Sequence, residues 1–140
     1  MADSQPELSI SRDKICFIAL KAREFDVKDV LTDAGDASNP SDDGMISVLE
    51  DHRTDPVVRE LVGFIRALSQ DERADLVALA WLGRGDGGIA DWDAMRAEAA
   101  REHNNRAASY LLGMPLLSDF LKVGLDKFGG SCVEFESEHL

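Results

Sequence analysis

A short stretch rich in glycine and aspartate, residues Gly83–Gly88, matches the pattern G-x-G-x-x-G that is found at dinucleotide sites. There the glycines follow a β-strand and let the backbone approach a pyrophosphate at a helix N-terminus. Here the preceding residues predict a helix, because Ser69 and Glu72 form a capping-box pattern and alanines follow it. Asp86 would also bring a negative charge to the phosphates. We therefore expect this stretch to connect two helices, and not to bind a dinucleotide.

Three carboxylates in the same region, Asp86, Asp91 and Asp93, provide oxygen ligands of the kind that hard cations prefer. An EF-hand loop aligned on its glycine would need ligands where Leu82 and Arg84 stand, which excludes an orthodox calcium loop. An irregular cation site that uses the three aspartates remains an alternative. The simpler interpretation is that Asp91 caps the next helix and Asp93 interacts with the helix dipole.

Two tryptophans, Trp81 and Trp92, flank the stretch, and Arg84 lies between them. Tryptophan and arginine are enriched in binding hot spots, and a guanidinium can hold a carboxylate or phosphate through two hydrogen bonds. These residues favour a binding site at the turn. In the alternative interpretation both rings pack on the turn and fix the angle between its helices, and Arg84 pairs with a neighbouring aspartate.

An unusually polar run, His103, Asn104, Asn105 and Arg106, interrupts an alanine-rich segment. Such side chains compete for backbone hydrogen bonds inside helices and often mark a polar surface. The run is therefore either a solvated face or a surface for a ligand or partner. The sequence contains no paired histidines at metal-ligand spacing and no serine or cysteine nucleophile motif. We expect no catalytic residue, no bound metal and no cofactor, which disfavours an enzyme.

Apolar residues at helical spacing predict that an all-α domain positions these candidates. No run of residues shows the alternation typical of a β-strand. We expect a compact bundle of five to six helices with a long acidic loop at residues 27–44. The predicted helices are residues 12–26, 42–51, 56 to about 68, 70–82 with Gly83 after the last turn, 91–112 and 115–128.

The chain of 140 residues is expected to hold a single domain, at residues 11–129. Residues 1–10 are predicted to form a flexible lead-in, and they lack the basic and apolar regions of a signal peptide. Residues 130–140 are predicted to form a disordered acidic tail.

Acidic residues outnumber basic ones by 27 to 15, and the net charge is −12. This charge argues against binding to nucleic acid or to an anionic membrane, and it favours a basic partner. Cys16 lies among apolar residues and Cys132 in the polar tail, so we expect no disulfide framework and a cytoplasmic location.

Two segments, Asn39–Asp51 and Asp75–Gly87, carry a resemblance to a known family. With them, the chain resembles a family of short bacterial proteins, of alphaproteobacterial type, that is defined only as a domain of unknown function. The likeness extends from Leu8 to Gly129. It implies a stand-alone cytosolic bacterial domain and implies no activity, cofactor or site residue.

The sequence as a whole favours a small interaction or regulatory domain that binds an unidentified protein, with a homodimer left open. The expected recognition surface centres on the turn between Trp81 and Trp92. The alternative is a protein that binds a small ligand or a divalent cation at residues 83–93. The residues expected at the recognition surface are Trp81, Arg84, Asp86, Trp92, His103, Asn104 and Asn105.

Overall fold

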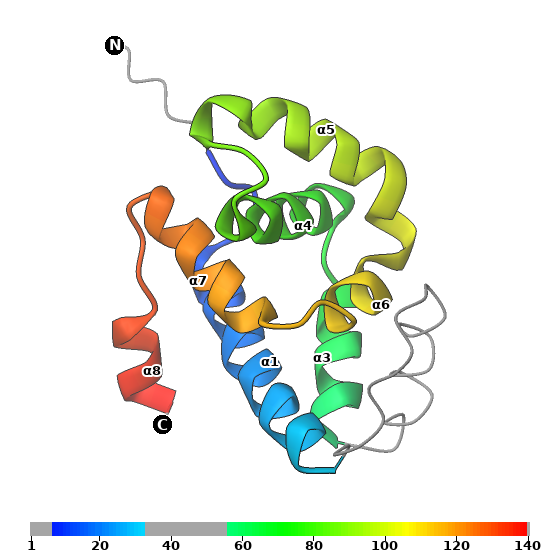
Figure 1. Cartoon of the computed structure of the whole chain (residues 1–140), viewed down its shortest axis with the longest axis vertical. Coiled ribbons are helices and arrows are strands. Elements are labelled where there is room, and N and C mark those ends of the chain that lie inside the picture. Colours follow the sequence, from blue (N-terminus) through cyan, green and yellow to red (C-terminus); the bar gives the residue numbers. More distant parts are fainter. Residues whose placement is uncertain (1–6, 33–55, 140) are drawn as a thin grey trace.

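Helix α4 (Gln70–Arg84) lies at the centre of the computed structural model, which describes residues 7–32 and 56–139 (Figure 1). All residues of α4 from Ala74 to Leu82 are buried. A helix that is covered on every side belongs to the interior of a domain. Helix α5 (Trp92–His103) packs on one side of α4, and α7 (Leu117–Lys127) packs on another.

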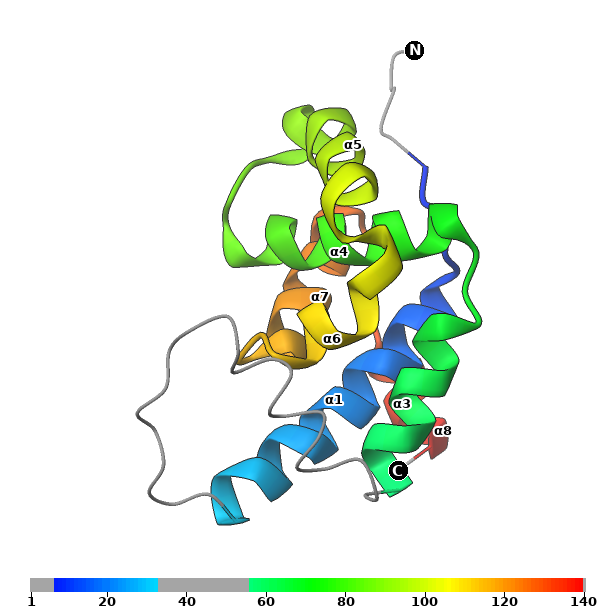
Figure 2. The same cartoon turned by 90° about the vertical axis from the view of Figure 1, so that its right-hand side faces the viewer.

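The other helices surround this centre. Helices α1 (Arg12–Thr32) and α3 (Pro56–Arg66) lie side by side (Figure 2). The short helix α6 (Ala107–Leu112) contacts α3 and α4, and α8 (Val133–His139) contacts α1. In the described ranges the protein has seven α-helices and no β-strand, which confirms the all-α prediction.

The start of α4 follows the predicted capping box. The amide of Glu72 donates to Ser69 Oγ at 3.1 Å, and the amide of Ser69 donates to Glu72 Oε1 at 2.9 Å. The end of α4 differs from the prediction, because Gly85 (φ 97°), not Gly83, terminates the helix in the left-handed conformation. Gly83 has a packing role, since a Cβ there would lie 1.8 Å from the carbonyl oxygen of Phe120.

The predicted single helix over residues 91–112 is wrong. A 3₁₀ turn, η1 (Ile89–Asp91), precedes α5, and a second one, η2 (Asn104–Arg106), separates α5 from α6. The break falls at the polar run that follows His103, where asparagines disfavour continued helix. The chain can therefore turn at η2 and place α6 against α3.

Two other boundaries differ from the prediction. Helix α1 continues past residue 26 to Thr32, so the first part of the expected acidic loop is helical. Helix α7 begins at Leu117 instead of Pro115, because Leu116 adopts a left-handed backbone (φ 64°). The rest of the expected loop and the expected helix at residues 42–51 lie outside the described residues.

The described end of the predicted lead-in is ordered. The amides of Ser9 and Ile10 both donate to the carboxylate of Asp75, and Ile10 is buried. Asp75 in α4 therefore satisfies the backbone amides of these two residues, which belong to the segment predicted to be a flexible lead-in.

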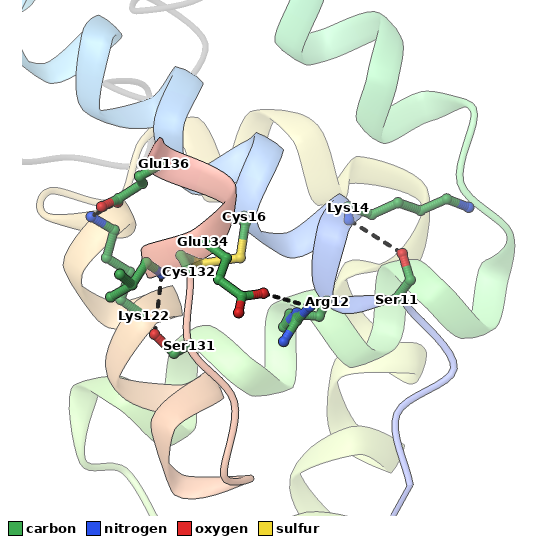
Figure 3. Close-up of a disulfide and its surroundings, with 10 residues drawn as sticks. Ser11, Arg12, Lys14, Cys16, Lys122, Ser131, Cys132, Glu134 and Glu136 are labelled. Atoms are coloured by element: carbon green, nitrogen blue, oxygen red, sulfur yellow. Dashed lines mark hydrogen bonds and ion pairs between the residues drawn. A yellow bond between two sulfur atoms is a disulfide. The ribbon is translucent and has the colours of Figure 1, made fainter. Parts of the chain in front are cut away.

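A disulfide between Cys16 in α1 and Cys132 attaches the C-terminal segment to the core (Figure 3). Lys122 in α7 also pairs with Glu136 at 2.5 Å. Residues of the predicted tail form α8. The expectation of no disulfide is wrong for Cys16 and Cys132. The reason is a contact between residues 116 positions apart, which no local pattern reveals.

One apolar core joins the helices, and no described helix has the length and hydropathy needed to cross a membrane. The largest side chains that are fully buried are Ile10, Ile15, Ile18, Leu61, Ile65, Leu76, Leu79, Leu82, Trp92, Leu111, Leu117 and Leu121.

Candidate interaction site

Three aromatic rings meet beside the C-terminal half of α4. Trp81 of α4 is 9% exposed, and its indole Nε1 donates to Tyr110 Oη in α6 at 2.8 Å. The ring of His103, at the end of α5, stacks on Tyr110 with centroids 4.0 Å apart and meets Trp81 edge-on at 5.6 Å. Edge-on and stacked pairs of this kind stabilise a site beyond their buried area. The cluster thus fixes three helices relative to one another.

An exposed ion pair lies at the end of the same helix. Arg84 Nη2 and Nε donate to Asp86 Oδ2 at 2.6 and 3.1 Å, and the side chains are 39% and 42% exposed. The hydrogen bond to Asp86 raises the pKa of Arg84 above its ordinary value, and Tyr110 adds a smaller effect in the same direction. Arg84 therefore pairs with Asp86 and lies near Tyr110 of the aromatic cluster. We call Arg84, Asp86, His103 and Tyr110 the α4 rim.

Trp92 does not belong to this rim. It is 2% exposed and packs edge-on against Phe128, with ring centroids 4.9 Å apart. The expectation that Trp92 anchors a partner is wrong, because its ring fills the core beside the turn. Both tryptophans fit the alternative role, in which they fix the angle between the helices, because Trp92 is buried and Trp81 is nearly so.

The polar run that begins at the last residue of α5 is divided between two parts of the surface. His103 is half-buried in the aromatic cluster, whereas Asn105 is exposed and lines a separate cavity with Arg106. The side chain of Asn104 lies outside the described part of the structure. The structure thus brings together Trp81, Arg84, Asp86 and His103 from the predicted set.

The aspartates of the alternative cation site have other partners or lie apart. Asp86 pairs with Arg84, and Asp91 accepts a hydrogen bond from the amide of Gly88 at 2.9 Å. Asp93 is exposed in the first turn of α5. Over residues 7–32 and 56–139, no three histidine, cysteine or acidic side chains are grouped to hold a metal ion. Asp91 is the third residue of η1 and is bonded back to the cap residue Gly88, which differs from the predicted role as the cap of the following long helix.

A family model matches residues 58–129, just over half of the chain. The chain belongs to the family described as "Protein of unknown function (DUF3775)". No curated protein and no solved structure matches the chain. The DUF3775 match is narrower than the expected likeness, and it contains the whole α4 rim. The disulfide and α8 lie outside the matched residues.

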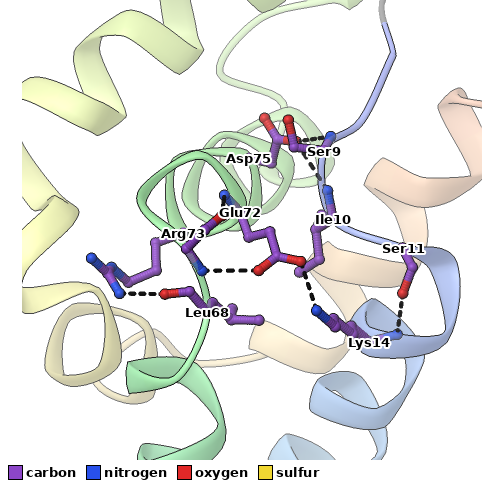
Figure 4. Close-up of polar contacts among 9 residues, drawn as sticks. Ser9, Ile10, Ser11, Lys14, Leu68, Glu72, Arg73 and Asp75 are labelled. Carbon is purple, nitrogen blue, oxygen red and sulfur yellow. Dashed lines mark hydrogen bonds and ion pairs between the residues drawn. The ribbon is translucent and has the colours of Figure 1, made fainter.

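A buried ion pair near the start of α4, also inside the DUF3775 region, was not predicted. Asp75 is fully buried and accepts hydrogen bonds from the amides of Ser9 and Ile10 (Figure 4). It also accepts one from Arg96 Nε. Arg96 also pairs with Asp71 at 3.2 Å. The hydrogen bond to Asp75 raises the pKa of Arg96, and burial opposes this effect. No local pattern identifies these partners, because they lie far apart in the sequence.

Tyr110 was also missed, although the sequence carries a signal for it. His103 and Tyr110 are seven residues apart, which places two helical positions on one face. In a continuous helix these two positions would share a face, and their rings still stack across the break at η2. Tyr110, and not Trp92, is the partly exposed aromatic residue beside Trp81.

Proposed function

We propose that the protein is a small interaction or regulatory domain that docks a protein partner on the α4 rim. The observation that carries the proposal is the exposed Arg84–Asp86 pair beside the partly exposed rings of His103 and Tyr110. Tyrosine and arginine are over-represented among interface hot spots. The mechanism is docking, and no chemical step is assigned to it.

The roles on the α4 rim follow from exposure and charge. Tyr110 offers a ring that is held by the indole of Trp81, so little side-chain entropy is lost when a partner covers it. Arg84 can exchange its bond with Asp86 for a carboxylate of the partner. Asp86 then becomes available to a basic group. The net charge of −12 steers a basic partner towards the domain.

A charge reversal tests the proposal. We expect Arg84→Glu to abolish the capture of a partner from native lysate, measured by quantitative mass spectrometry of proteins that co-purify with the domain. Arg23→Glu is the matched control, since Arg23 is an exposed arginine of α1 outside the α4 rim. Circular dichroism checks that both variants are folded.

Two results would contradict this role of the α4 rim. A partner retained equally by Arg84→Glu would place the surface elsewhere. Equal loss in both variants would show that overall charge governs binding. Light scattering on the same samples distinguishes a second copy of the chain from a different partner.

A cytoplasmic location is part of the proposal, and the cysteines test it. Disulfides are rare in reducing compartments, and Cys16 and Cys132 are bonded to each other here. Acid quenching of intact cells followed by thiol alkylation measures their state in the cell. A cytoplasmic protein is expected to carry both thiols reduced, whereas a fully oxidised pair would indicate an oxidising compartment.

A further inference from the structure

A cavity of about 430 Å³ opens between the end of α3 and the segment that joins η2 to α6. Among the described residues that line it, three are arginines and none is acidic, although acidic residues dominate the chain as a whole. The cavity therefore concentrates positive charge in a strongly acidic protein. The lining residues are Ile65, Arg66, Arg73, Asn105, Arg106, Ala107, Ala108 and Ser109.

The three arginines come from three elements. Arg66 is exposed in the last turn of α3, Arg73 lies in the first turns of α4, and Arg106 is exposed in η2. Arg73 is held in place because its Nη1 donates to the carbonyls of Leu68 at 2.6 Å and Arg66 at 3.3 Å. Figure 4 shows the bond from Arg73 to Leu68. Three guanidinium groups from separate elements that line one cavity can donate hydrogen bonds to a single bound anion from different sides.

The remaining lining residues suit the rest of a small ligand. Ile65, Ala107 and Ala108 are buried beneath the cavity, where they belong to the core that supports its floor. Asn105 and Ser109 add a side-chain amide and a hydroxyl, and Ser109 Oγ lies 3.5 Å from the carbonyl of Arg106. Ligand sites commonly combine an apolar wall with a few polar groups in a volume of about 300–1,000 Å³.

We propose that this cavity binds a small phosphorylated molecule, with its phosphate held by Arg66, Arg106 and the anchored Arg73. Guanidinium groups match phosphate oxygens through paired hydrogen bonds. A tetrahedral phosphate can accept such bonds from several directions, as the three elements require, whereas a planar carboxylate accepts them in one plane. The site goes beyond the proposed docking function and uses none of the α4 rim side chains.

The test is calorimetric titration of the full chain with inorganic pyrophosphate, with citrate as the carboxylate comparison. We expect saturable binding of one pyrophosphate per chain and weaker binding of citrate. The double variant Arg66→Ala/Arg106→Ala should bind pyrophosphate about 100-fold more weakly, since each charged hydrogen-bond donor accounts for about tenfold. Arg23→Ala/Arg59→Ala is the matched control, because it removes equal charge from exposed arginines outside the cavity.

A second substitution separates geometry from charge. Arg66→Lys/Arg106→Lys keeps the positive charges but loses the paired donors, so we expect about tenfold weaker binding. Unchanged affinity in either cavity variant, or an equal loss in the Arg23/Arg59 control, would overturn the proposal. Absence of pyrophosphate binding up to about 1 mM would also overturn it, and tighter binding of citrate would overturn the choice of phosphate.

Discussion

The two ends of α4 carry ion pairs of the same chemical type in opposite surroundings. Near the N-terminal end, the fully buried Asp75 is bonded to Arg96 and to two backbone amides. At the C-terminal end, the Arg84–Asp86 pair is exposed on both sides. We call these the closed end and the open end of α4.

The difference assigns different tasks to the two pairs. Removing one partner of a buried pair leaves an uncompensated charge and is strongly destabilising. An exposed pair contributes little to stability, so its residues are available for recognition. The closed end therefore holds the N-terminal segment, α4 and α5 together, whereas the open end can exchange partners at little cost. Exposure, and not the presence of an ion pair, separates the structural pair from the pair that we propose for partner binding.

The largest loss of stability is expected from a substitution at the closed end. Asp75→Ala leaves the amides of Ser9 and Ile10 without their acceptor and leaves Arg96 only its pair with Asp71, so we expect a loss of about 3–5 kcal/mol in the free energy of unfolding. Urea denaturation followed by circular dichroism measures this loss. Asp86→Ala is the matched control at the open end. A similar loss of stability in both variants would contradict the difference between the closed and open ends.

The next effect concerns the disulfide between Cys16 and Cys132. Cys16 lies in α1, the helix that also carries Lys14, and Lys14 binds Glu72 near the closed end. Cys16→Ala/Cys132→Ala removes a cross-link between residues 116 positions apart. We expect a loss of about 2–4 kcal/mol, because the unfolded chain gains freedom. A reductant should lower the stability of the wild type towards that of the variant and leave the variant unchanged. A wild type that is insensitive to reductant would contradict this expectation.

A smaller effect on stability, which depends on pH, is expected near the closed end. Lys14 Nζ donates to Glu72 Oε2 at 2.7 Å, and this bond, with the Ser69 amide, lowers the pKa of Glu72 from 4.5. The folded state then binds fewer protons than the unfolded state, so this contribution is complete above pH 4.5 and is lost as the pH falls through the lowered pKa.

Glu72→Gln tests the direction of this pH dependence. We expect the variant to be about 1 kcal/mol less stable than the wild type at neutral pH, and the difference to shrink on acidification below pH 4.5. Chemical denaturation across a pH series measures it. A difference that stays constant down to pH 2–3, well below the ordinary carboxylate pKa, would show that Glu72 acts through packing and not through its charge.

The smallest effect is expected at the open end. Arg84→Ala removes an exposed pair and should change the free energy of unfolding by less than about 0.5 kcal/mol. The same urea titration measures it, with Arg23→Ala as an exposed surface control. A loss above about 2 kcal/mol would mean that Arg84 is structural and would weaken its assignment to recognition.

Local patterns in the sequence predicted a large part of the fold. The capping box of Ser69 and Glu72 located the start of α4, because its two hydrogen bonds join residues three positions apart. Helical spacing of apolar residues identified the all-α class. The terminating glycine was misplaced, since Gly83 and Gly85 look equivalent until the close approach of Phe120 is known.

The site was predicted only in part, because long-range contacts decide it. Arg84, Asp86 and His103 were chosen from residue type, and the structure places them on one rim with Tyr110. Burial of Trp92 against Phe128 depends on how the turn and α7 pack, which spacing along the chain does not specify. The same holds for the Cys16–Cys132 bond.

Site-specific photo-crosslinking tests the central claim most directly. A photoreactive residue is placed at the open end, at position 86, and in a control protein at position 126 of α7, where Asp126 is also exposed. Irradiation in native lysate is followed by mass spectrometry. The account predicts that one protein is crosslinked from position 86 and that position 126 does not crosslink it. Equal crosslinking from both positions, or crosslinking from position 126 alone, would contradict the α4 rim as the recognition surface.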